Sequence, residues 1–288
     1  MIKIPAKKQP RWRKIDKDDF HKAEDYLKAR EKFCVTASAR FLRIQKNRNG
    51  HIWHIQCQEG EIAALLLHCR KSLFPVFNSR SCIPGPRFLN RFLGKVQIHS
   101  LQGLKEDAEL LENLMEEQGY YATERIDYDL MGLDNAAIPK ITRADPADLV
   151  FRFPLPEDME ALFSLQSAYE QEEVLPKNAV FNPAASRLGL EKILSSEQIF
   201  VAELGGQVIG KINTSAESFS RIQVGGVYVR PDCRGRGIAA KMTIAFLQNL
   251  SSNGKDITLF VKKRNNAAKA VYRKIGFAVL GDYRISYF

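Results

Sequence analysis

The chain has 288 residues, of which 45% are hydrophobic and 26% charged, and its formal net charge is +10. This length is about twice that of a typical domain, so two domains with separate cores are expected. No stretch is long and apolar enough to cross a bilayer, and the basic N-terminal segment is followed by no apolar run. We therefore expect neither a membrane-spanning helix nor a signal peptide, and no membrane partner.

The cysteines indicate a reducing compartment. Their number, five, is odd, and no pair shows the Cys-x-x-Cys or Cys–His spacing typical of a metal site. We therefore expect free thiols, a cytoplasmic location and no bound metal. The cysteines are Cys34, Cys57, Cys69, Cys82 and Cys233.

Charge is unevenly distributed along the chain. The first 100 residues contain 21 Lys and Arg against 8 Asp and Glu, whereas residues 101–148 contain 4 against 12. A basic segment of this kind can bind nucleic acid or an acidic protein. Because no RNA-binding signature with interleaved aromatic residues accompanies it, a solvated surface is the favoured interpretation, and nucleic acid is not an expected partner.

The first half predicts an α/β domain that ends at residue 148. Apolar residues at helical spacing follow a polar N-terminal segment, and two alternating segments separated by Gln58-Glu59-Gly60 are typical of a hairpin. Residues 134–148 contain two prolines and little periodicity, so they form the expected linker. In chain order we predict helices over 17–32 and 35–46, strands over 51–57, 61–69 and 73–77, a short helix over 88–93, a strand over 96–101, a helix over 105–118 and a strand over 120–131.

Residues 149–288 predict a second α/β domain with a mixed sheet. Pro156 followed by two acidic residues is typical of a helix start, and Gly205-Gly206 separates two segments typical of a hairpin. A parallel strand–helix–strand unit follows, for which a right-handed connection is expected. In chain order we predict a strand over 149–153, helices over 156–172 and 184–194, strands over 199–204, 207–215 and 223–229, a helix from 238, a strand over 257–262, a helix from 265 and a strand over 277–288.

The most informative stretch is Gln223–Met242, which predicts a strand, a glycine-rich turn and the start of a helix. Gly225 and Gly226 interrupt the β-branched strand and predict a bulge, and Pro231 ends the strand. The following turn, Arg234–Ala239, can direct several backbone N–H groups into one concavity at a helix N-terminus, which is typical of a phosphate site. Taken alone, the turn favours a plain strand-to-helix connection over a phosphate site.

A second motif, in Asn265–Phe277, reads N-x-x-A-x-x-x-Y-x-x-x-G-F. Asn265 lies at a helix start, where its side-chain oxygen can accept from unpaired amides. Asn265, Ala268 and Tyr272 share one face of the helix. Gly276 ends the helix, and the last strand follows.

In this order and at this spacing, the two motifs resemble the GNAT superfamily of acyl-CoA-dependent N-acyltransferases. The turn Arg234–Ala239 matches the family's R/Q-x-x-G-x-G/A pyrophosphate motif, and Tyr272 matches the tyrosine of its later helix. The predicted elements of residues 149–288 also follow the order of one GNAT domain. The resemblance implies acetyl-CoA, or another short acyl-CoA, as co-substrate and N-acetyltransferase activity on a primary amine by direct attack.

The resemblance also assigns roles to residues. The turn would bind the pyrophosphate, the backbone of Val227–Val229 the pantetheine arm and the thioester carbonyl, and an N–H near Val229 the developing oxyanion. Asn265 would hold the pantetheine arm or cap its helix. The expected cofactor-binding residues are Val227, Tyr228, Val229, Arg234, Gly235, Arg236, Gly237, Ile238, Ala239 and Asn265.

Tyr272 matches the family's general acid. A phenol with a pKa of about 10 is protonated at neutral pH and can donate to a leaving thiolate. The alternative is a buried tyrosine that packs beside Phe277.

An amine acceptor is mostly protonated at neutral pH, so a base or a desolvating pocket is needed. Glu172 and Glu173 end a predicted helix near the expected acceptor site, and Glu173 is the predicted catalytic residue. A solvated helix end is the alternative interpretation of both.

The first half repeats the order of elements of the second half without its first strand. Gly119 lies where Gly276 lies in the second half, but Met115 replaces Tyr272 and the loop 79–86 has no phosphate motif. We therefore predict a degenerate GNAT-like domain over residues 1–148 without a cofactor site. The alternative is an unrelated α/β domain.

A different functional class is also compatible with the sequence. The chain could be a non-catalytic CoA-binding or regulatory adaptor that binds RNA or protein through its basic N-terminal region. The motifs leave the amine acceptor and the oligomeric state open.

Overall fold

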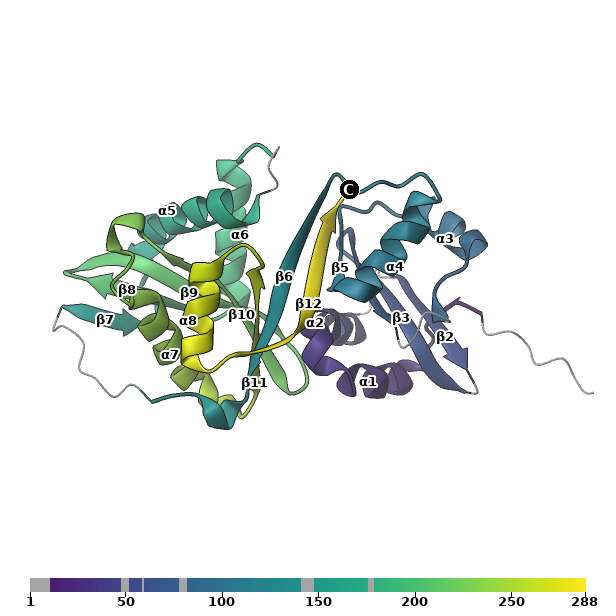
Figure 1. The fold of residues 1–288 in the computed structure, drawn as a ribbon, viewed down its shortest axis with the longest axis horizontal. Helices are drawn as coiled ribbons and strands as arrows, with labels where there is room; N and C mark the ends of the chain where they lie inside the picture. The colour runs from purple at the N-terminus through teal and green to yellow at the C-terminus, as the bar shows by residue number, and fades with distance from the viewer. Residues whose placement is uncertain (1–10, 48–51, 59, 78–81, 141–147, 176–178) are drawn as a thin grey trace, which may run out of the picture. The chain divides into compact units, whose positions relative to one another are not determined.

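The computed structural model describes residues 11–47, 52–58, 60–77, 82–140, 148–175 and 179–288. These residues form two compact units (Figure 1). Unit 1 comprises Met1–Tyr128 and Gly281–Phe288, and unit 2 comprises Asp129–Leu280. Unit 2 thus begins before the expected linker, and the C-terminal residues belong to unit 1.

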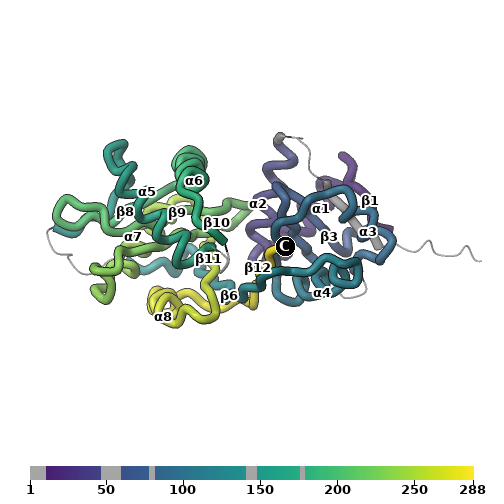
Figure 2. The backbone as a smooth tube through the Cα atoms, turned by 90° about the horizontal axis from the view of Figure 1, so that it is seen from above, coloured from purple at the N-terminus to yellow at the C-terminus, as the bar shows by residue number. Residues whose placement is uncertain are grey.

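Unit 1 contains a sheet with strand order β1-β2-β3-β4-β5-β12. Helices α3 and α4 pack on one face, with Leu89, Leu111 and Met115 buried against strand residues such as Leu66 and Leu101. Helices α1 and α2 lie on the other face (Figure 2). The elements are β1 Arg13–Lys14, α1 Phe20–Lys28, α2 Glu31–Asn47, β2 Ile52–Gln58, β3 Glu61–Cys69, β4 Ser72–Phe77, α3 Pro86–Leu93, β5 Ser100–Leu104, α4 Lys105–Glu116, β6 Glu124–Leu133 and β12 Ala278–Tyr287.

Unit 2 contains a sheet with strand order β6-β11-β10-β9-β8-β7. Helices α7 and α8 cover one face and form the main core, whereas α5 and α6 lie on the other (Figure 2). The elements are β7 Leu149–Arg152, α5 Met159–Tyr169, a π-helical turn Glu170–Val174, α6 Pro183–Ser196, β8 Ile199–Leu204, β9 Gln207–Glu217, β10 Arg221–Val229, α7 Ile238–Leu250, β11 Asp256–Lys262 and α8 Asn266–Ile275. Short 3₁₀ turns occupy Asn135–Ala137, Pro156–Asp158, Pro231–Cys233 and Ser251–Asn253.

The two units share one succession of strand pairings, which confirms the predicted duplication of the fold. In unit 1, β2, β3 and β4 are antiparallel and β5 is parallel to β4. In unit 2, β8, β9 and β10 are antiparallel and β11 is parallel to β10. In both units the parallel strands are joined through a helix, as such a connection requires.

The last strand of each unit comes from the other half of the sequence. The C-terminal strand β12 pairs with β5 of unit 1 through Tyr283–Tyr287, and the second part of β6 lies beside β11 of unit 2. A cut at residue 148 would therefore remove β12 from unit 1 and the second part of β6 from unit 2.

One predicted strand of unit 1 was wrong. The strand expected over 96–101 begins only at Ser100, because Val96 and Ile98 pack against the core from a loop instead of pairing with a strand. A short strand that the sequence analysis did not predict, Arg13–Lys14, precedes the first helix and pairs with β2.

The structure also bears on the predictions of free thiols and of no membrane-spanning helix. The four cysteines whose side chains are described are free thiols and buried. The side chain of Cys57 lies outside the described residues. None of the helices in the described part of the chain has the length and apolar character needed to span a membrane.

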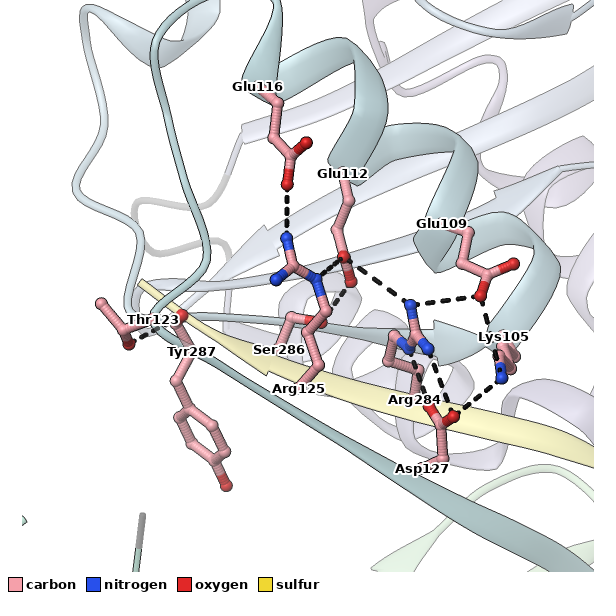
Figure 3. Close-up of polar contacts among 10 residues, drawn as sticks. All are labelled: Lys105, Glu109, Glu112, Glu116, Thr123, Arg125, Asp127, Arg284, Ser286 and Tyr287. Carbon is pink, nitrogen blue, oxygen red and sulfur yellow. Dashed lines mark hydrogen bonds and ion pairs between the residues drawn. The ribbon is translucent and has the colours of Figure 1, made fainter. Parts of the chain in front are cut away.

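A network of charged side chains holds the C-terminal strand against α4 within unit 1 (Figure 3). Arg284 Nε donates to Asp127 Oδ1 at 2.7 Å, and Arg125 Nε donates to Glu112 Oε2 at 2.7 Å. The Ser286 hydroxyl donates to the same Glu112 carboxylate, whose side chain is only 4% exposed. The hydrogen bond from Arg284 is the main reason that the pKa of Asp127 lies below its usual value.

Replacing Arg284 by Met should lower the free energy of unfolding by about 2–4 kcal/mol, because it leaves the carboxylates around it without their shared cation. Urea denaturation of the full-length protein measures this change. Lys28→Met, which removes an exposed partner of Glu24, is the control and should change stability little. Equal effects of the two substitutions would contradict a role of the network in holding β12.

Candidate functional site

The parallel strands of unit 2 separate before they end. Pairing between β10 and β11 extends over Arg221–Val224 opposite Asp256–Leu259 and goes no further. A register shift in β10 follows, between Gly225 and Tyr228. The last residues of β10 therefore have no partner in β11, and this end of the strand is an open edge.

Backbone groups of β10 point toward this open side. Arg230 N donates to Ile209 O of β9 at 2.8 Å, and Tyr228 faces Lys211 of β9. Because successive residues of a strand direct their N–H and C=O groups to opposite sides, Val227 and Val229 direct theirs away from β9. The carbonyl of Val229 accepts a hydrogen bond from Arg234 Nε at 2.9 Å. Because of this alternation, the N–H of Val229 also faces away from β9, toward the gap between β10 and β11.

Only glycine fits at the bulge. Gly226 has φ +61°, and a Cβ atom there would lie 2.0 Å from Asn213 Oδ1 and 2.9 Å from Lys211 Nζ. Two side chains of β9 thus occupy the space that any other residue at position 226 would need. The bulge and the two β9 side chains require one another.

The glycine-rich turn forms an exposed group of amides at the start of α7. Gly235 and Gly237 have φ +79° and +76°, and a Cβ atom built on either would meet nothing within 4 Å. Within the described residues, the N–H groups of Gly235, Arg236 and Gly237 donate to no protein acceptor. Free amides at a helix N-terminus with open space in front of them fit an anion such as a pyrophosphate.

The two arginines of the turn differ in their surroundings. Arg234 Nη2 pairs with Glu172 Oε2 at 2.9 Å, and the Tyr228 hydroxyl donates to the other oxygen of this carboxylate. Partial burial opposes ionisation of Glu172, but the hydrogen bonds from Tyr228 and Arg234 outweigh it and lower the pKa of Glu172. Burial, together with this hydrogen bond, raises the pKa of Tyr228 to about 12. Arg236 is exposed, so its side chain can reach a phosphate.

The π-helical turn after α5 directs two consecutive glutamates to different partners, an irregularity often found at functional sites. Glu172 contacts the glycine-rich turn through Arg234, as described above. Glu173 Oε1 accepts from Asn265 Nδ2 at 3.2 Å, and Glu173 Oε2 lies 3.5 Å from Lys262 Nζ. The two sequence motifs are therefore connected through neighbouring residues of one turn.

The second motif adopts the predicted local structure. Asn265 Oδ1 accepts from Ala268 N at 3.0 Å and caps α8, and Gly276 ends the helix with φ +116°. Tyr272 is 7% exposed, and its ring meets that of Phe277 edge-on at 5.8 Å. Burial, and then the nearby Tyr169 and Glu173, raises the pKa of Tyr272 above its ordinary value. Tyr272 therefore remains protonated at neutral pH.

Lys211 is the residue that the sequence analysis missed. Its side chain is 1% exposed, with Nζ 3.0 Å from Gly226 O, 3.3 Å from Asn213 Oδ1 and 4.9 Å from the centre of the Tyr169 ring. Burial lowers the pKa of Lys211 to about 7, and the Glu170 carboxylate opposes this shift in part. The only sequence signal is a lysine inside a strand of apolar residues that lies next to a glycine pair.

The buried lysine predicts a pH-dependent stability. Lys211→Met should stabilise the protein most below about pH 7, where the unchanged protein must bury an ammonium group. This advantage should shrink as the pH rises from about 7 toward the ordinary lysine value of 10.5. In this range folding requires Lys211 to release its proton, and that release costs less free energy as the pH rises. Thermal unfolding across this range, with Lys274→Met on the exposed side of α8 as control, measures the difference. A difference independent of pH would show that the pKa of Lys211 is ordinary.

Comparisons with known proteins agree with this geometry. Residues 159–277 match the model of the Acetyltransferase (GNAT) family. Over 144 residues the chain is 31% identical to a mycothiol acetyltransferase of Amycolatopsis mediterranei, an alignment that covers 43% of this chain and 48% of the relative. The chain thus spans about half the length of this curated relative.

Solved structures match over nearly the whole chain. A Drosophila protein superimposes with a TM-score of 0.68 at 12% identity, covering 97% of this chain and 99% of its own. A tandem GNAT protein from the clavulanic acid biosynthesis pathway superimposes with a TM-score of 0.59 at 11% identity, covering 97% and 98%. At such low identity these matches show the fold alone, which is that of two GNAT-like domains in tandem. The family match therefore identifies residues 159–277 as a GNAT acetyltransferase domain.

Proposed function

We propose that unit 2 transfers an acetyl or other short acyl group from acetyl-CoA to a primary amine. The observation that carries this proposal is the open edge of β10 beside a turn with free amides. The curated relatives are named mycothiol acetyltransferases, which supports acetyl as the transferred group. The acceptor is proposed on chemical grounds alone.

Acetyl-CoA would supply the acyl group as an activated thioester. The proposed pyrophosphate site is the turn Arg234–Ala239, whose amides and open space fit an anion, with Arg236 as the exposed cation. Arg234 acts differently from the sequence-based expectation, because Glu172 and the Val229 carbonyl already hold its guanidinium. We propose that Arg234 shapes the turn and that the amides bind the phosphates.

The open edge of β10 is the proposed site for the pantetheine arm. Val227 offers a backbone donor and acceptor, and Val229 offers its N–H, to a ligand that adds alongside the strand. The N–H of Val229 is the proposed donor to the oxygen on which negative charge develops during attack, an interaction that lowers the barrier. Asn265 already caps α8 and contacts Glu173, so any role in holding the arm would come in addition.

Tyr272 is the proposed general acid. Its phenol is protonated at neutral pH because burial disfavours the phenolate. A protonated phenol can transfer its proton to the leaving thiolate as that bond breaks.

The acceptor must lose a proton before or during attack, and two groups can receive it. Glu173 stays the proposed base at the acceptor side, with Asn265 and Lys262 fixing its orientation. Lys211 is a second candidate, because a lysine with a pKa of about 7 is neutral in a large fraction of molecules at neutral pH. Lys211 Nζ lies over the Tyr169 ring, and Tyr169 directly precedes the acidic turn that contains Glu173. A proton held by Lys211 is therefore near that turn.

Unit 1 is proposed to hold no CoA. The helix that corresponds to α7 is α3, and it begins at Pro86, which has no N–H to offer an anion. Its N-cap residue, Gly85, has φ −74° and so lacks the left-handed geometry of Gly235 and Gly237. The cytoplasmic location also stays a prediction.

Release of CoA from acetyl-CoA in the presence of a panel of primary amines tests the proposed activity on the full-length protein. Amine-dependent release supports it. The adaptor hypothesis instead expects CoA binding without turnover, together with salt-sensitive retention of RNA or an acidic protein. An absence of both acetyl-CoA binding and CoA release would contradict the proposal.

Tyr272→Phe should lower turnover by about one to three orders of magnitude while leaving acetyl-CoA binding nearly unchanged, because only the transferable proton is lost. Steady-state CoA release and calorimetric binding of acetyl-CoA measure the two quantities. Tyr121→Phe, on an exposed tyrosine of unit 1, is the matched control. Unchanged turnover in Tyr272→Phe would remove the tyrosine from the mechanism.

A further inference from the structure

Unit 1 contains a cavity of about 340 Å³ at the place where its own parallel strands separate. Strands β4 and β5 pair in parallel only over Ser72–Leu73 opposite Ser100–Leu101. The cavity lies between their diverging ends and the segment that joins α1 to α2. Among the residues that line it are Phe33, Cys34, Phe77, Gln102, Asp107 and Tyr283. A space of this volume is in the range of small-molecule sites.

One carboxyl group dominates the chemistry of this cavity. Asp107, in the first turn of α4, is 7% exposed and accepts a hydrogen bond from Phe77 N at 3.1 Å through Oδ2. Burial raises the pKa of Asp107 to about 7, which the hydrogen bond from Phe77 opposes in part. A buried carboxylate is costly unless a cation compensates it, so a cationic ligand would gain free energy at this position.

The groups around Asp107 are compatible with such a ligand. From the α1–α2 segment, Arg30 also lines the cavity and lies over the Tyr26 ring at 4.3 Å, and its charge offsets part of the rise in the pKa of Asp107. On α4, the exposed Glu106 adds a second acidic group to the cavity lining. On α2, burial raises the pKa of Cys34 to about 12, so this thiol is neutral at physiological pH.

The remaining wall is aromatic and neutral. Burial raises the pKa of Tyr283, on β12, so its phenol stays protonated. Its hydroxyl lies 3.5 Å from Gln102 Oε1. Phe33 and Phe77 provide apolar surface on the α2 and β4 sides. A ligand with a cationic end and an apolar body therefore matches the cavity better than an anion or a neutral polar molecule.

We propose that this cavity binds a small molecule that carries a protonated amine, with its ammonium group paired to Asp107 and its apolar part against Phe33 and Phe77. This proposal concerns unit 1 alone and does not depend on acyl transfer in unit 2. Such a ligand carries no phosphate, so its binding would not require the free amides that are missing at the start of α3.

Calorimetry of the full-length protein with 2-phenylethylamine, and with 2-phenylethanol as the uncharged match, tests the proposal. Saturable binding of the amine, at least about tenfold tighter than that of the alcohol, is expected, because only the amine compensates the carboxylate. The affinity should rise between about pH 6 and about pH 8 as Asp107 ionises, since the amine stays protonated over this range. Equal affinity for both probes, or no binding of the amine, would overturn the proposal.

Two variants test whether the amine binds in this cavity. Asp107→Asn keeps an oxygen for the Phe77 amide but loses the charge, so it should weaken amine binding at least about tenfold. Glu117→Gln, on an exposed carboxylate at the end of the same helix, is the control and should leave binding unchanged. Amine binding of the same strength in Asp107→Asn would refute the assignment.

Should Asp107→Asn fail to fold, Ala37→Leu takes its place, because it fills the cavity from α2 without touching the carboxyl group. Loss of amine binding in a folded Ala37→Leu protein supports the cavity as the site, and retained binding refutes it. CoA release, measured in parallel, should be unchanged in these variants. The two proposals can therefore fail separately.

Discussion

The early end of the pairing between β10 and β11 is the constraint on which the proposed site depends. Parallel strands normally continue their hydrogen bonds to the end of the shorter strand, and here they stop at Val224. The bulge at Gly226 turns the remaining backbone away from β11, and the packed side chains of Lys211 and Asn213 leave no room for another residue in its place. A buried lysine is costly unless its amine is hydrogen-bonded, and here the Gly226 carbonyl and Asn213 Oδ1 accept from Lys211 Nζ.

The two units show how one arrangement of strands can serve different chemistry. In both units the parallel strands stop pairing after a few residues, at the same position of the fold. In unit 2 the unpaired end of β10 adjoins a turn rich in free amides, whereas in unit 1 a cavity at the corresponding place is lined by a buried carboxyl group. An amide-rich turn favours an anion, and a buried carboxylate favours a cation. We propose that the duplicated domain lacks phosphate binding but has a cavity with a chemistry of its own.

Sequence reasoning reached the features that depend on neighbours in the chain and missed those that depend on distant ones. The bulge at Gly225–Gly226, the cap at Asn265 and the helix end at Gly276 follow from local residue preferences, and the structure contains all three. Lys211 escaped notice because its neighbours, Tyr169 and Gly226, approach it only through folding. The exchange of β6 and β12 between the units was missed for the same reason, since strand partners far apart in sequence leave no local signal. The apolar alternation over 96–101 predicted a strand too early, because burial of a loop produces the same pattern.

Hydrogen–deuterium exchange of the full-length protein with saturating acetyl-CoA tests the central claim most directly. It reads out the backbone amides that are proposed to bind the co-substrate, without relying on knowledge of the acceptor. The proposed site predicts slower exchange in peptides covering residues 227–229 and 235–239, with no change at the start of α3. Unaltered exchange in those peptides, or protection confined to unit 1, would contradict the assignment of the open strand edge and the glycine-rich turn as the acyl-CoA site.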